Sequence, residues 1–191
     1  MHFLLGQSYT ENQSYQKAVA EYLKALQVHP DFLAARLGLA TAYWGIGQVD
    51  KALAEAQTAV KQSPDDPEAA CLMAEILMAR RQYAEATPYL DKALRSPRVD
   101  ALRVHALRSR VLMAEGKATE ALAELQQALP SDTDGSYHYQ LAQIYQRLGD
   151  PSAAAAALKE SERIRNANRD KRNPMPLTEV TPDRRIPEEP Q

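Results

Sequence analysis

The sequence is short of cysteine, glycine, phenylalanine and tryptophan, and each shortage excludes a class of protein. Cys71 is the only cysteine among 191 residues, so the chain has no internal disulfide framework and no cysteine-based zinc site. Seven glycines, two phenylalanines and one tryptophan do not suit a β-sandwich or barrel, which needs many turns and β-branched or aromatic strands. Alanine is abundant instead, and this strong helix former predicts an all-α protein.

Long apolar runs and an excess of one charge are missing too. No run approaches the roughly 18 apolar residues that a membrane span needs, and the first residues lack the basic and apolar regions of a signal peptide. The net charge of −2 gives no electrostatic case for nucleic acid or an anionic membrane. We expect a soluble, cytoplasmic protein with no nucleic-acid partner and no membrane insertion, although a signal peptide could lie upstream if the chain is a fragment.

What the sequence does have is an internal repeat. Several independent residue classes recur at intervals of about 34 residues. The recurring positions are small (Ala18, Ala52, Ala86, Ala121, Ala154), proline (Pro30, Pro64, Pro97, Pro130) and tyrosine or leucine (Tyr9, Tyr43, Leu77, Leu112, Tyr145). Chance rarely keeps one period in three classes, so we expect a repeated structural unit.

Each unit has the pattern of two helices. Leu5, Gly6 and Tyr9 lie on one stripe of a first helix, and Ala18, Tyr22 and Ala25 on one stripe of a second. A short polar break separates them, with a glycine near most breaks, which suits a helix end that needs a left-handed residue. A helix hairpin of this kind cannot bury its apolar stripe alone, so the hairpins must stack on one another.

The pattern Leu5-Gly6-x-x-Tyr9, Ala18-x-x-x-Tyr22 and Pro30 resembles the tetratricopeptide repeat. The resemblance implies an all-α, right-handed α-solenoid of about five helix hairpins. The predicted units are 1–32, 33–66, 67–100, 101–134 and 135–164, with a polar helix extension that completes a 1–172 solenoid and a Pro-rich disordered tail at 173–191. Two positions depart from the family: the one that often holds Trp (here His2, Arg36, Ala70, His105 and His138) and Arg108, which stands at a leucine position and casts doubt on the packing of unit 4.

The sequence contains no recognisable catalytic constellation. It has no glycine-rich phosphate loop, no nucleophile elbow and no HExxH motif. Three histidines, His2, His105 and His138, share one repeat position and so should be spread along the solenoid, whereas metal ligands must converge. We therefore predict no enzyme, no catalytic residue, no cofactor and no metal site.

The family resemblance implies a concave groove lined by the first helices, which holds a peptide or helix of a partner. The candidate groove residues are Trp44, Glu75, Met78, Arg103, Arg110, Met113, Tyr139 and Gln143. Trp44, Met78 and Met113 share one repeat position and are expected to form an apolar line, while Arg103 and Arg110 are suited to a carboxylate. Two alternatives stay open: Trp44 packs as core, and the arginines pair with Glu68 and Glu75. The chaperone-tail clamp of some members is absent, because its positions hold Phe3, Gln7, Gly38, Glu68 and Leu72.

The function expected on these grounds is a protein–protein interaction scaffold or adaptor with a protein or peptide partner. The alternative is an accessory repeat region, a fragment of a larger enzyme or bacterial envelope-assembly protein. Phe3 and Leu4 are expected to be partly exposed, because nothing precedes unit 1 in the sequence to cover them; this indicates a fragment, or self-association through that face. A further hypothesis is that the segment Met175-Pro-Leu177 docks in the groove.

Overall fold

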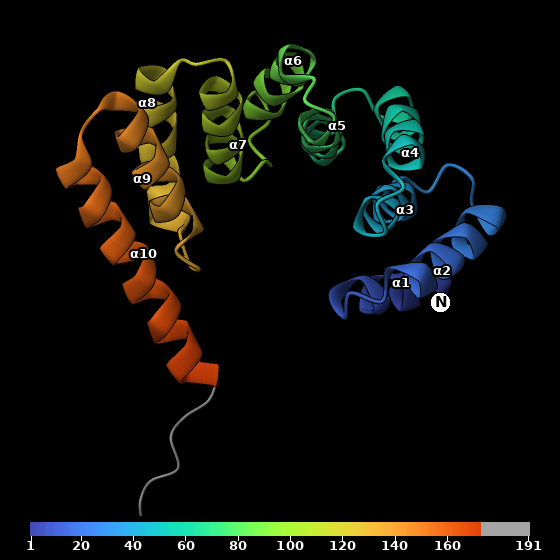
Figure 1. Ribbon diagram of the computed structural model, residues 1–191. Helices are drawn as coiled ribbons and strands as arrows, with labels where there is room; N and C mark the ends of the chain where they lie inside the picture. The colour runs from blue at the N-terminus through green and yellow to red at the C-terminus, as the bar shows by residue number, and fades with distance from the viewer. Residues whose placement is uncertain (173–191) are drawn as a thin grey trace, which may run out of the picture.

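The computed structural model describes residues 1–172, and this part of the chain is helical throughout apart from its turns (Figure 1). The helices in chain order are α1 (His2–Glu11), α2 (Tyr15–Val28), α3 (Leu33–Gly45), α4 (Val49–Gln62), α5 (Pro67–Ala79), α6 (Tyr83–Leu94), α7 (Ala101–Ala114), α8 (Ala118–Ala128), α9 (Ser136–Leu148) and α10 (Pro151–Arg172), with a 3₁₀ turn, η1 (Leu129–Ser131), before α9. The tail predicted at 173–191 lies outside the described residues.

Consecutive helices pair into five hairpins that stack in chain order into an arch (Figure 1). The first helix of each hairpin packs against its own partner and, from α1 to α7, against the next first helix as well. Those first helices therefore form a continuous inner layer, and α2, α4, α6 and α8 stand behind it. The α-solenoid predicted from the repeat period is confirmed.

The apolar stripes pack into three clusters along the arch rather than one central core. At each hairpin crossing a small residue is fully buried: Ala18, Ala52, Ala86 and Ala121 have no exposed surface. Because alanine has only one side-chain carbon, it lets the two helix backbones come close enough to bury their neighbours. The recurring alanines thus mark the contact that closes each hairpin.

Tyr22 holds units 1 and 2 together. Its ring is 2 % exposed and lies against the backbones of Gly6 in α1 and Gly38 in α3. A methyl group at Gly6 would lie 2.7 Å from ring carbons of Tyr22, and one at Gly38 would overlap the same ring. The Tyr22 hydroxyl lies 3.2 Å from the Thr10 hydroxyl, so the polar tip keeps a partner. Both glycines are needed for close packing and not for backbone freedom.

All five hairpin turns use a left-handed residue at the same repeat position. Gly47, Gly116 and Gly149 have φ of 77°, 81° and 79° there, as the glycine pattern predicted. In units 1 and 3 the position holds Gln13 (φ 56°) and Arg81 (φ 63°). Residues with a side chain pay a steric penalty in this conformation, so two of the five turns are strained and three are not.

The two helices that begin with a proline, α5 and α10, are both capped by the aspartate before it. Asp66 and Asp150 each precede a proline at the first helical position, and each accepts a 2.9 Å bond from a backbone N–H three residues on. The carboxylate accepts a hydrogen bond from a backbone N–H that has no partner inside the helix. Proline has no N–H, and at the first helical position that N–H would have been unpaired in any case. Helices α5 and α10 therefore begin at Pro67 and Pro151.

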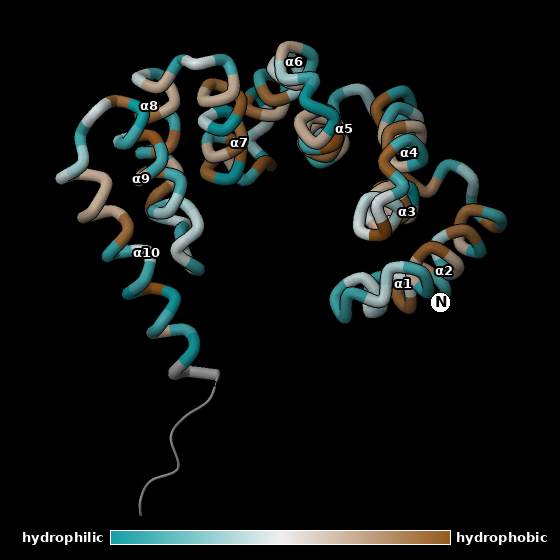
Figure 2. The backbone as a smooth tube through the Cα atoms, in the orientation of Figure 1, coloured by the Kyte–Doolittle hydropathy of each residue, from teal (hydrophilic) through white to brown (hydrophobic). Residues whose placement is uncertain are grey.

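The two ends of the described chain differ in polarity. The second half of α10 is mostly hydrophilic (Figure 2) and runs past the start of α9 (Figure 1), where Asn168 donates to the carbonyl oxygen of Thr133. At the other end Leu4 and Val28 are 66 % and 67 % exposed, and Phe3 is half-buried against Phe32. The outer face of unit 1 is therefore apolar and uncovered. Each helix within residues 1–172 is too short or too polar to cross a lipid bilayer.

The left-handed turns allow a test in which one substitution should raise the free energy of unfolding and another should lower it. We expect Arg81→Gly to stabilise the protein by about 1 kcal/mol, because glycine adopts the left-handed conformation without the steric penalty of a side chain. Gly47→Ala should destabilise it by about the same amount, since nothing lies within 4 Å of the added methyl and only the conformation changes. Urea unfolding followed by circular dichroism measures both. A destabilised Arg81→Gly would show that the Arg81 side chain contributes contacts that outweigh the strain.

Candidate functional site: the inner face of the arch

The candidate site is the inner face, defined as the side chains of α1, α3, α5, α7 and α9 that point away from their second helices. Its apolar residues are less exposed than expected. Met78 is only 5 % exposed and packs in the middle one of the three apolar clusters, so it offers little surface to a ligand, and its role as an apolar anchor stays a prediction. Trp44 and Met113 are half-buried and pack at the edges of two different clusters. The three residues therefore do not form one exposed apolar line.

Arg103 forms ion pairs with neighbouring acidic side chains. Its guanidinium donates to Glu75 at 2.8 Å and to Glu68 at 3.3 Å, both on α5. Glu75 is largely buried, and pairing with Arg103 offsets the cost of removing its charge from water. This confirms the pairing alternative for Arg103, which links units 3 and 4 across the inner face.

Arg110, Tyr139 and Gln143 remain accessible. Arg110 is exposed on α7, two helical turns from Arg103, and makes no ion pair or hydrogen bond within residues 1–172. Tyr139 is 47 % exposed, and Gln143 lies one turn further along α9. These three side chains are the predicted groove residues that a ligand can reach most directly.

The histidines at the shared repeat position close hairpins. His2 and His105 place Nδ1 at 2.6 Å and 2.7 Å from the carboxylates of Glu21 and Glu124, each nineteen residues later on the second helix. Arg36 makes the equivalent pair with Glu55 at 2.7 Å. This explains the departure from tryptophan at that position, because a polar pair replaces a large apolar ring.

Units 3 and 5 lack this polar pair and have other residues at the two positions. In unit 3 both members are replaced together, by Ala70 and Tyr89, so neither is left without a partner. In unit 5 Ala157 stands where the carboxylate would be, and His138 instead lies 2.6 Å from Asp132 in the preceding turn. Within the part of the chain that the structure describes, no three His, Cys, Asp or Glu side chains converge to hold a metal ion.

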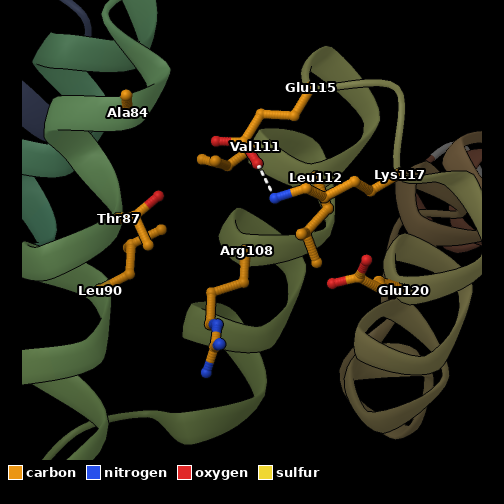
Figure 3. Close-up of a pocket in the computed structure, with 9 residues that line it drawn as sticks. All are labelled: Ala84, Thr87, Leu90, Arg108, Val111, Leu112, Glu115, Lys117 and Glu120. Atoms are coloured by element: carbon orange, nitrogen blue, oxygen red, sulfur yellow. Dashed lines mark hydrogen bonds and ion pairs between the residues drawn. The ribbon is translucent and has the colours of Figure 1, made fainter.

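A cleft that sequence analysis did not foresee lies between α6 and the hairpin α7–α8 (Figure 3). Its volume is about 380 Å³, and it is lined by Ala84, Thr87, Leu90, Arg108, Val111, Leu112, Glu115, Lys117 and Glu120. Arg108 stands at the leucine position of unit 4 and is 31 % exposed; its two ion pairs, with Asp91 and Glu124, are long at 3.5 Å. A similar cleft occurs one unit earlier, beside Met73 and Leu77.

Family models match most of the chain. The tetratricopeptide repeat matches residues 9–76, 47–111 and 135–168. A comparison with curated proteins found no match.

Solved structures share the architecture. A thermophilic TPR protein of Thermus thermophilus superposes with a TM-score of 0.75 at 24 % identity, over 90 % of this chain and 93 % of that one. MamA from Desulfovibrio magneticus RS-1 superposes with a TM-score of 0.72 at 17 % identity, over 87 % and 94 %. At these identities the likeness shows a common fold.

The first test from this geometry concerns Cys71. Burial raises the pKa of the Cys71 thiol to about 11, and the side chain is 1 % exposed. Because the thiolate is the reactive form, we expect Cys71 in the folded protein to resist a thiol reagent such as DTNB at pH 8 and to react at once in denaturant. Ser152→Cys, at an exposed position, should react rapidly in the folded state. Rapid reaction of native wild type would contradict the burial.

The second test concerns Arg108. We expect Arg108→Leu to stabilise the protein by about 1 kcal/mol, because a buried leucine gains more from the apolar wall of the cleft than two weak ion pairs contribute. Arg108→Ala removes the same pairs without filling space and should destabilise it. Thermal unfolding compares the three proteins. Equal destabilisation by both substitutions would mean that the ion pairs, and not the cleft, decide stability at this position.

Proposed function

Because the chain belongs to the tetratricopeptide repeat family, we propose that it is a protein–protein interaction scaffold or adaptor that holds a peptide or helix of a partner against its inner face. Repeats of this family generally mediate protein–protein contacts. The observation that carries the proposal is the continuous inner layer from α1 to α7, extended by α9, with half-exposed and exposed side chains from every unit.

The inner face suits binding because it is formed before a partner arrives. Each first helix is fixed by its own second helix and, from α3 onward, by the second helix of the preceding hairpin, so little conformational entropy remains to be lost. Trp44 and Met113 are half-buried, and Tyr139 is about half exposed. Such aromatic and thioether groups are common anchors at protein interfaces.

The apolar outer face of unit 1 is a separate surface. Leu4 and Val28 project from it, and His2, Phe3 and Phe32 border a shallow depression of about 210 Å³. Self-association through this face remains a prediction, and the inner-face proposal does not depend on it.

The proposal is tested by photo-crosslinking at three glutamines. A photoreactive amino acid is placed at Gln7 or Gln143 on the inner face, or at Gln126 on the outer helix α8; all three are exposed. After irradiation in the native host, we expect protein adducts from the two inner positions and none above background from Gln126. Adducts from Gln126 with none from Gln7 or Gln143 would place the interaction on the outer surface and refute the proposal.

A further inference from the structure

Charge is distributed unevenly along the inner layer. Helix α5 carries Glu68 and Glu75 and no basic residue, whereas α7 and α9 contain no aspartate or glutamate at all. The arginines of α7 and α9 are Arg103, Arg108, Arg110 and Arg147. The inner layer therefore changes from acidic in unit 3 to basic in units 4 and 5, although the net charge of the whole chain is −2.

Two of these arginines already have ion-pair partners within the chain. Arg103 is held by Glu75 and Glu68, and Arg108 lies toward Asp91 and Glu124. Arg110 and Arg147 are exposed and have no ion pair or hydrogen bond within residues 1–172. The positive charge left over on the first helices is thus concentrated in units 4 and 5.

Exposed polar groups accompany these two charges along α9. Tyr139, Gln143 and Arg147 follow one another at four-residue intervals, so they share one face of the helix, and all three are exposed. The opposite side of α9 is buried through Leu141 and Ile144. The exposed face offers a ring for stacking, an amide and a guanidinium in sequence, and the first helix of the preceding unit carries the exposed Arg110.

We propose that the partner segment is an acidic peptide, whose aspartate or glutamate side chains bind Arg110 and Arg147 on the inner face of units 4 and 5. The inference rests on the peptide-binding function proposed above and adds the chemistry of the ligand. A guanidinium donates two parallel hydrogen bonds to a carboxylate, which is the strongest pairing that these groups make. Glu68 and Glu75 share the single positive charge of Arg103, so this cluster keeps one net negative charge, which disfavours the acidic part of the peptide at unit 3.

Charge favours a peptide over a nucleic acid. Nucleic acids gain affinity from many phosphate contacts at once, and two unpaired arginines on a chain of net charge −2 supply few. A short acidic peptide needs only one or two such contacts, together with the ring of Tyr139 and the amide of Gln143.

The test is selection of a random twelve-residue peptide library displayed on phage against the full chain. The same selection uses Arg110→Glu/Arg147→Glu and, as a matched control, Arg165→Glu, which reverses an exposed arginine on α10. Circular dichroism checks that all three proteins are folded. We expect wild type and Arg165→Glu to enrich peptides rich in Asp and Glu. The double variant Arg110→Glu/Arg147→Glu should bind the best of them about tenfold or more weakly, at least the effect of losing one charge-assisted bond.

The outcomes separate the two proposals. Enriched peptides without acidic residues, or acidic peptides that bind the double variant equally well, would overturn this inference and leave the inner-face function standing. Failure of every protein to enrich any peptide would count against both. If acidic peptides are recovered only after Glu179, Glu188 and Glu189 are changed to Gln, the occupant is the chain's own 173–191 segment. That result would overturn the inference of a separate partner.

Discussion

The structure depends on the close approach of two helices within each hairpin, which a fully buried alanine permits. Ala18, Ala52, Ala86 and Ala121 occupy that crossing in four successive units, and because each is fully buried in a close-packed interior, a larger side chain there would have to displace its neighbours. Once the crossing is closed, the remaining apolar residues of both helices form a single surface. That surface is buried only by the next hairpin, so the stack and its inner face follow from the same contact.

The fold could be predicted from the sequence because the period appears in residues with different physical roles. Alanines mark crossings, prolines mark the connections between units, and Asp150-Pro151 marks a helix start; each role is local and leaves a local signature. The left-handed turns were only partly visible. Gly47 reveals such a turn, but Gln13 and Arg81 adopt the same conformation with no sign in their chemistry, because the neighbouring helices impose it.

The candidate site was less predictable, since helical spacing gives the direction of a side chain and not its depth. Met78 and Met113 share a repeat position, yet one is core and the other is half-buried, because each depends on the side chains of a different neighbouring unit. Arg103 and Arg110 look equivalent in sequence. Only the position of α5 shows that one is paired with Glu75 and the other is not.

The pair formed by Arg103 and Glu75 also has a mechanical consequence. It is a tie across the inner side of the arch, and any widening of units 3 and 4 must stretch it. Between α7 and α9 the described residues contain no such tie. Curvature is therefore held by an ion pair only at the joint between units 3 and 4. Within residues 1–172 the other joints of the inner layer have no ion pair between their first helices, and the last of these joints lies between the helices that carry Arg110 and Arg147.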